Sequence, residues 1–492
     1  MSNQLHMKKI VLFSLISLCF STIFAQQKPN IVFILADDLG YSELGCYGQQ
    51  LIKTPNLDKL SKEGMRFTQF YSNTLCAATR CSFVTGLDGA HAQVRDNFEL
   101  GGFADEEEKG QYPLAENTVT IARELRKVGY KTALTGKWGL GGPGSTGIPN
   151  KQGFDFFYGY LDQKQAHNYY PSHLWRNEKA EWLQEYFSPH QRFTNDTTAN
   201  PYDKYKGKIY APDTITSEAM KFITTNKKDP FFLYLAYTLP HLALQVPDSE
   251  LKQYEGMFDE KPYNGDKGYL PHPKPVSAYA AMISLLDKYV GKIISCLEEN
   301  GIRDNTLIIF CSDNGATVPG TGGAATGFFK SNGDLRGYKG SLYEGGIREP
   351  FIANWKSVIK PGTTNNRVCS IWDMFASFSE ISGIKKASPT NGISLLPVFK
   401  GNKTKEHNYL YWEVHSYDNG AQAVRWKNWK AIRKNLNSGT GTHIELYDLA
   451  ADSAEKNDLS SQYPEIVLKM KKLMDKREPA VIKEWNFQQA LK

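Results

Sequence analysis

A cysteine and an arginine four residues apart are the first candidates for chemistry in this sequence. Cys76 and Arg80 bound the segment Cys-Ala-Ala-Thr-Arg, which follows a strand-like run at 67–71 and opens a predicted helix at 77–85. The N-terminus of a helix attracts anions through its dipole and its unpaired backbone N–H groups. The segment is therefore a candidate anion-binding turn with a nucleophile, although five such residues also suit the buried start of an ordinary helix.

Two pairs of oxygen-bearing residues directly follow apolar runs. They are Asp37-Asp38 and Asp313-Asn314. Adjacent carboxylates are costly to bury unless a cation neutralises them. Four hard oxygen donors suit Ca²⁺ or Mg²⁺, and the sequence lacks the cysteine or histidine clusters of structural zinc sites. Either pair alone would fit a turn or a helix cap equally well, but two pairs in the same place relative to a strand favour a metal site.

The elements that must position these residues alternate along the chain. Continuous apolar runs predict buried strands at 30–36, 131–135, 231–237 and 306–311. Apolar residues at helical spacing predict helices at 118–128 and 276–297. This alternation predicts an α/β fold with a large, mostly parallel sheet sandwiched by helices. Ligands of such sheets bind beyond the carboxyl ends of the strands, where the polar residues fall.

The pattern changes after about residue 389. Short predicted strands, separated by turn residues, are followed by a helix near 466–476. We therefore expect a catalytic α/β domain at 26–388 and a smaller C-terminal antiparallel α+β subdomain at 389–492.

A set of motifs in one order resembles the type I, formylglycine-dependent sulfatases of the alkaline phosphatase superfamily, from about Asn30 to the C-terminus. The matching residues are the strand 30–40 with Asp37 and Asp38, Cys76 with Arg80, Gly136-Lys137-Trp138, Pro240-His241, Asp313-Asn314-Gly315 and Lys339. The resemblance implies that Cys76 is oxidised to formylglycine, which serves as nucleophile and metal ligand. It also implies one calcium ion held by the two oxygen-bearing pairs, stabilising charges on Arg80, Lys137 and Lys339, and protonation of the leaving alcohol by His241.

Two positions depart from the family pattern. Ala78 stands where the signature usually has proline, which leaves open whether a formylglycine-generating enzyme or an anaerobic sulfatase-maturating enzyme modifies Cys76. Gly139 stands where family members commonly carry a histidine that contacts the formylglycine. His91 is the candidate replacement, and a packed or capping histidine is the alternative interpretation.

The resemblance to exported bacterial carbohydrate sulfatases implies a sulfated carbohydrate substrate. Fragments of glycosaminoglycans or algal galactans fit, with galactose or N-acetylgalactosamine esters favoured. The polar, aromatic loop 163–171 would line the sugar subsite, with His167 or Asn168 bonding hydroxyl groups, or would be an ordinary packed loop. Two other functions compete: a phosphatase or phosphodiesterase of the same superfamily, and a non-catalytic binder of sulfated glycans, which Ala78 and Gly139 would favour.

Residues 1–25 have the pattern of a secretory signal peptide, because Lys8-Lys9 precede the apolar run 10–20 and the small residue Ala25. That run is short for a membrane span, and no later segment resembles one. We expect an exported protein, in the periplasm, with secretion or surface anchoring as alternatives. The net charge of +6 is spread over 492 residues without a basic tract, which argues against a nucleic-acid partner.

Overall fold

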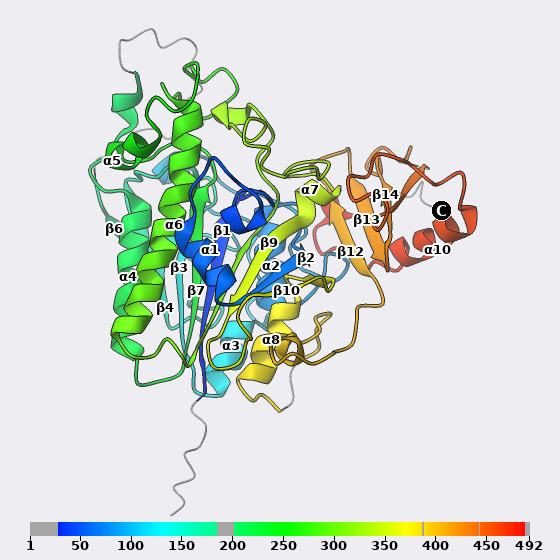
Figure 1. The fold of residues 1–492 in the computed structure, drawn as a ribbon, viewed down its shortest axis with the longest axis horizontal. Coiled ribbons are helices and arrows are strands. Elements are labelled where there is room, and N and C mark those ends of the chain that lie inside the picture. The colour runs from blue at the N-terminus through cyan, green and yellow to red at the C-terminus, as the bar shows by residue number, and fades with distance from the viewer. Residues whose placement is uncertain (1–27, 185–200, 386–387, 442, 488–492) are drawn as a thin grey trace, which may run out of the picture.

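The computed structural model describes residues 28–184, 201–385, 388–441 and 443–487 (Figure 1), so the predicted signal peptide lies outside the described residues. The main sheet has eleven strands, in the order β10-β2-β9-β8-β1-β7-β3-β4-β5-β6, with β11 also paired to β2. Their bounds are β1 Asn30–Asp37, β2 Met65–Tyr71, β3 Lys131–Lys137, β4 Phe156–Tyr160, β5 His173–Arg176, β6 Lys179–Trp182, β7 Phe231–Pro240, β8 Thr306–Ser312, β9 Arg348–Asn354, β10 Thr363–Asn365 and β11 Cys369–Ser370.

The centre of this sheet is parallel, which confirms the predicted fold class. Strands β8, β1, β7, β3 and β4 pair in parallel, whereas β9, β5 and β6 join antiparallel nearer the edges. A strand covered on both faces carries apolar residues without alternation, which explains the continuous apolar run of β1. All four strands predicted from such runs are present.

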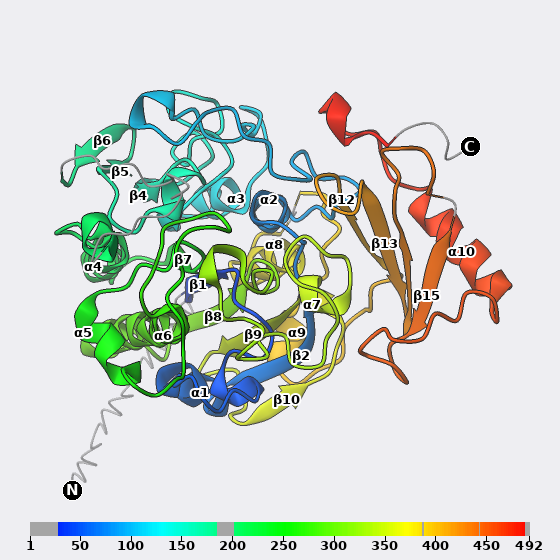
Figure 2. The ribbon, with the colours of Figure 1, turned by 90° about the horizontal axis from the view of Figure 1, so that it is seen from above.

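Helices cover both faces of the sheet (Figure 2). The helices are α1 Pro55–Lys62, α2 Cys76–Thr85, α3 Ile121–Lys127, α4 Ala211–Asn226, α5 Asp248–Leu251, α6 Pro275–Glu299, α7 Glu344–Ile347, α8 Asp373–Ile381, α9 Leu396–Phe399 and α10 Pro464–Met474. Val32 and Ile34 of β1 belong to the apolar cluster of α1, α4 and α6. Phe33 and Leu35 belong to that of α2, α3 and α8. The helix predicted at 118–128 begins three residues later, because the Thr120 hydroxyl caps it by accepting from the Arg123 N–H.

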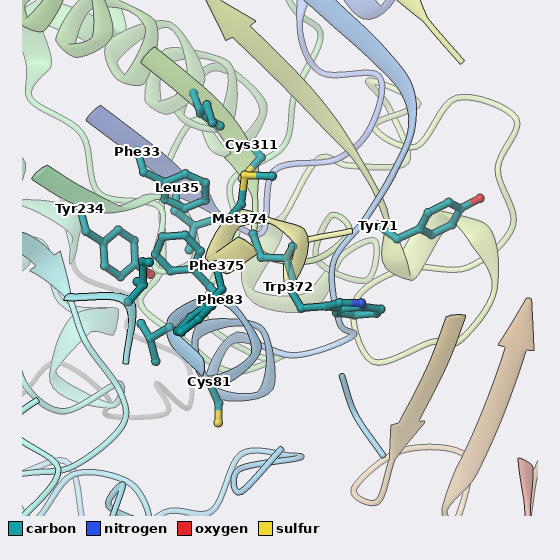
Figure 3. Packing of buried hydrophobic residues seen from close by; sticks show 14 of the residues in the cluster. Phe33, Leu35, Tyr71, Cys81, Phe83, Tyr234, Cys311, Trp372, Met374 and Phe375 are labelled. Atoms are coloured by element: carbon teal, nitrogen blue, oxygen red, sulfur yellow. The ribbon is translucent and has the colours of Figure 1, made fainter. Parts of the chain in front are cut away.

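Helix α2 is held by the core beneath the sheet, as Figure 3 shows. All ten of its residues are buried. The ring of Phe83 stacks on Phe33 of β1 with centroids 4.0 Å apart and lies edge-on to Tyr234 of β7 at 4.8 Å. This packing fixes the helix N-terminus, and therefore Cys76, against the carboxyl edge of the central strands.

The smaller antiparallel sheet is also as predicted. It consists of β12 Leu410–Val414, β13 Ala421–Trp426, β14 Trp429–Arg433 and β15 Ile444–Asp448, in that order. Helix α10 packs on it beside the main body (Figure 1). The Trp412 indole N–H donates to the Ser72 carbonyl at 2.8 Å, which ties this sheet to the chain just before α2. None of the helices in the described part of the chain has the length and apolar character that crossing a membrane requires.

Candidate active site

The polar residues predicted at strand ends meet beyond the carboxyl edge of the central sheet. Asp37 ends β1, Lys137 ends β3, His241 follows β7, and Asp313 follows β8. Cys76 opens α2 beside them. Parallel pairing aligns the ends of neighbouring strands, so residues more than two hundred positions apart share one buried site.

Oxygen donors surround the Cys76 thiol. It donates to Asp37 Oδ1 at 3.2 Å and lies 3.6 Å from Asn314 Oδ1. The Asn314 amide donates to Asp38 Oδ1 at 2.8 Å, and the Asp38 N–H donates to Asp313 Oδ1 at 3.1 Å. The structure therefore brings together all five residues expected to hold a metal ion.

The donor set fits a hard divalent cation. Ligand atoms of Asp37, Asp38, Cys76 and His241 lie within 4.8 Å of one another. The three aspartates are almost completely buried. Burial, followed by the negative charge of Asp37, raises the pKa of Asp313, although the positive charge of Arg80 opposes the increase. Carboxylate and amide oxygens are the usual protein ligands of Ca²⁺.

Three buried or nearly buried cations face these carboxylates. Lys137 Nζ lies 2.6 Å from Asp37 Oδ2, and Arg80 Nη2 lies 3.1 Å from Asp313 Oδ2. Lys339 Nζ lies 2.9 Å from Asp38. Although burial disfavours its ammonium, the Asp37 carboxylate keeps the pKa of Lys137 above its ordinary value. All three cations are therefore charged and fixed where an anion could enter.

His241 is hydrogen-bonded on both ring nitrogens. Its Nδ1 is 2.6 Å from the Leu242 carbonyl, to which it can only donate, so Nε2 accepts from Lys339 Nζ at 3.0 Å. Burial and then the Lys339 charge lower the pKa of His241 to about 4. The imidazole is thus neutral at rest, and the adjacent proton is carried by Lys339.

Side chains without a sequence signal hold this cluster in place. The Thr317 hydroxyl donates to Asp38 Oδ2 at 2.8 Å, and the Thr79 hydroxyl donates to the Asp313 carbonyl at 2.6 Å. Asn97 Oδ1 accepts from the Ala77 N–H at 3.1 Å, at the start of α2. Isolated threonines and asparagines in loops are too common for sequence patterns to single them out, although Thr79 lies inside the Cys-to-Arg motif.

A pocket of about 350 Å³ opens above the cluster. Its polar and aromatic lining consists of Asp38, Asn97, Glu99, Gln163, His167, His241, Tyr269, Thr317, Thr321, Lys339, Ser416 and Tyr417. The predicted subsite residue His167 stacks on His241 with ring centroids 4.5 Å apart. Ser416 and Tyr417 follow β12, so the C-terminal sheet completes the pocket wall.

Two of the predicted residues lie elsewhere. Asn168 does not line the pocket, and its side chain accepts from the Tyr170 N–H in a local turn. His91 does not line it either, and its Nδ1 pairs with Asp88 Oδ1 at 2.5 Å, which agrees with the capping interpretation. Gln163 occupies the space beside Gly139 instead. A Cβ at Gly139 would lie only 2.4 Å from Gln163 Nε2.

The comparisons with known proteins identify a family. The Sulfatase family model matches residues 29–384, and the model for the C-terminal region of N-sulphoglucosamine sulphohydrolase matches 337–479. The chain is 28% identical to the N-acetylgalactosamine-6-O-sulfatase of Bacteroides thetaiotaomicron, over 91% of this chain and 93% of that protein. It is 28% identical to mouse arylsulfatase J, over 90% and 74% respectively. The crystal structure of Ps i-CgsB in complex with k-i-k-neocarrahexaose is similar with a TM-score of 0.72 and 28% identity, covering 94% of each chain.

Proposed function

This chain belongs to the sulfatase family and is a sulfuric ester hydrolase, and we propose that it removes sulfate from sulfated sugars, using a formylglycine made from Cys76 and one calcium ion. The observation that carries the proposal is the position of Cys76. Its Sγ lies at a buried helix N-terminus, 3.2 Å from Asp37 and beside three cations. In this arrangement Sγ stands in for the attacking oxygen of the modified residue.

The residues present fit the calcium ion and the modification. Asp37, Asp38, Asp313 and Asn314 would hold the calcium, which when bound polarises a sulfate oxygen and favours a deprotonated nucleophile. Formylglycine in its hydrated form supplies two hydroxyl groups on one carbon, so that one can attack sulfur and the other can later expel sulfate.

The cations of this chain bind and orient the sulfate group. Arg80 and Lys137 are held rigidly by Asp313 and Asp37, and Lys339 reaches the pocket surface. Fixed charges in a site shielded from water stabilise the negative charge that grows on the sulfate and leaving oxygens, without reorganisation during the reaction.

The leaving alcohol must gain a proton. Lys339 and His241 share a hydrogen bond at 3.0 Å, and both line the pocket. Because His241 is neutral and Lys339 is charged, the pair carries one transferable proton at the pocket surface. We assign protonation of the leaving group to this pair, in which Lys339 carries the proton and the neutral His241 orients the ammonium by accepting its hydrogen bond at Nε2.

The relatives support a sulfated sugar as the substrate. One is named for N-acetylgalactosamine esters, and the similar crystal structure holds a neocarrahexaose oligosaccharide. The pocket volume suits one sugar ring. Fragments of glycosaminoglycans or algal galactans, with galactose or N-acetylgalactosamine esters favoured, are therefore the proposed substrates.

We also propose where the chain is located and how it is modified, from the sequence pattern of residues 1–25 and from the position of Cys76. The chain would be exported to the periplasm after loss of residues 1–25, and a formylglycine-generating or an anaerobic sulfatase-maturating enzyme would modify Cys76. N-terminal sequencing of the mature protein tests the first statement. Expression in hosts that contain one maturation system or the other tests the second.

The decisive experiment is the mass of the peptide containing Cys76, from protein made in its native host, together with sulfate release from sulfated sugars. A formylglycine mass and sulfate release are expected. Phosphate release from matched phosphate esters in place of sulfate would favour the phosphatase alternative. An unmodified thiol in a protein that binds sulfated glycans without turnover would favour the binding protein.

A further inference from the structure

One acidic side chain faces the pocket from outside the charged cluster. Apart from Asp38, Glu99 is the only acid among the described residues that line it. The cations of the cluster are each paired with an aspartate, whereas the side chain of Glu99 accepts its hydrogen bond from the uncharged amide of Gln111. A carboxylate beside a site that binds an anion repels that anion. The position of Glu99 in the pocket lining therefore suggests a function other than binding sulfate.

Glu99 is held in a fixed position. It forms an antiparallel bridge with Gln111, whose side-chain amide donates to Glu99 Oε2 at 2.5 Å and to Asp162 Oδ1 at 3.1 Å. Two residues earlier, Asn97 binds the first turn of α2. The segment 97–99 therefore connects Glu99 to helix α2, which carries Cys76. Gln111 donates to only one of the two Glu99 carboxylate oxygens, so the other can accept a hydrogen bond from a ligand in the pocket.

The surroundings of Glu99 suit a hydroxyl group rather than an anion. Burial, followed by the charge of Asp162, raises the pKa of Glu99 to about 7. Such a carboxyl group donates or accepts a hydrogen bond near neutral pH, and a sugar hydroxyl group can do both. A sulfate group only accepts hydrogen bonds and carries a charge, so the ionised form of Glu99 would repel it, although the charges of Lys164 and Lys137 act on Glu99 in the opposite sense to that of Asp162.

We propose that Glu99 is a specificity-determining residue, which hydrogen-bonds a ring hydroxyl group of the sugar and excludes a second sulfate from that position. The inference rests on the proposed function and narrows it, because the ring that enters the pocket would then carry a single sulfate. The cationic cluster would bind that sulfate, and the Glu99 carboxyl group would hydrogen-bond a hydroxyl group of the same ring.

The test compares wild type with Glu99→Gln, which keeps the size of the side chain and removes the charge. Substrates are N-acetylgalactosamine 6-sulfate and its disulfated counterpart, which carries a second sulfate on the same ring. We expect wild type to favour the singly sulfated sugar in kcat/KM by at least about tenfold, and Glu99→Gln to lose about tenfold of that preference. Glu106→Gln removes an exposed charge from the same loop and should leave the preference unchanged.

Binding separates this inference from the proposed function. Calorimetry with the Cys76→Ala chain measures the affinity for both sugars without turnover, alone and combined with Glu99→Gln. The inference would be supported, and the proposed function refuted, by two results together: Glu99→Gln reduces the binding preference for the singly sulfated sugar, and the wild-type protein releases no sulfate. If Cys76→Ala and the double variant show the same preference between the two sugars, while the wild-type protein releases sulfate, the inference is overturned and the proposed function is not. Thermal unfolding checks each variant, and Glu99→Ala serves as the second substitution if Glu99→Gln does not fold.

Discussion

Lys430 offers a stringent test of how the C-terminal sheet supports the site. Its Nζ lies 2.9 Å from Glu344 Oε1 and 2.9 Å from Glu455 Oε1, and all three side chains are fully buried. Glu344 begins α7, directly after the loop that carries Lys339. Lys430 therefore joins β14 of the small sheet to the segment that positions a proposed catalytic residue.

The magnitude follows from the pKa of Glu344. Burial opposes ionisation, but Lys430 and neighbouring arginines lower this pKa from 4.5 to about 2. Because the folded value lies below the unfolded value, this stabilisation is present above pH 4.5 and is lost as the pH falls toward 2. A shift of that size corresponds to about 3 kcal/mol. Lys430→Met removes the largest cationic contribution and leaves Glu344 Oε1 without a positive partner, although Arg348 still lies 3.4 Å from Oε2, for a loss of about 3–5 kcal/mol at pH 7.

Urea unfolding at pH 7 measures this loss, with Lys472→Met on the exposed face of α10 as the matched control. The control should change the free energy of unfolding by less than about 0.5 kcal/mol. We also expect the difference between Lys430→Met and wild type to shrink as the pH falls from 5 toward 3, since protonation of Glu344 relieves the unpaired charge. If Lys430→Met unfolds like the control, the buried pair does not hold the two sheets together and the reasoning is refuted.

Three further predictions concern the site. Cys76→Ala should abolish turnover and change the melting temperature little, because a small buried side chain with only weak hydrogen bonds is lost; residual activity above a few per cent would contradict the nucleophile assignment. Chelation should remove activity, and calcium should restore it better than zinc; indifference to chelators would count against the oxygen site. Gly139→Ala should lower kcat/KM about tenfold, because its φ of 80° disfavours a side chain and the new Cβ would displace Gln163; unchanged kinetics would show that Gln163 is not needed where it lies.

The predicted site residues that the structure brings together share one property. Asp37, Asp313 and His241 each follow a continuous apolar strand, and parallel strands bring their carboxyl ends together. The apolar pattern of the strands is therefore enough to predict that these residues lie close together, because the conformation of the loops between the strands does not enter the argument. Cys76 and Arg80 lie one helical turn apart on a helix that is buried along its whole length, so their relation is also local.

The residues that the sequence did not predict depend on contacts between loops. Gln163 reaches Gly139 because both follow neighbouring strands, and nothing in its local pattern distinguishes it from the glutamines around it. Glu99 acquires its character only through Gln111 and Asp162, which come from two other segments. His91 was a reasonable candidate by residue type, but Asp88, three residues before it, provides a partner that its own turn places there.

The charges of the site indicate how a bound divalent cation would contribute to binding as well as to chemistry. Asp37, Asp38 and Asp313 carry three negative charges when ionised, and Arg80, Lys137 and Lys339 carry three positive charges, so the buried cluster alone is balanced. A neutral cluster has little attraction for a sulfate ester, which must leave water to enter. A bound divalent cation would give the cluster a net charge of about +2, which would attract the substrate and offset the negative charge that grows in the transition state. Loss of the cation should therefore raise KM and also lower kcat. A change in kcat alone would mean that the lysines and the arginine bind the sulfate without help.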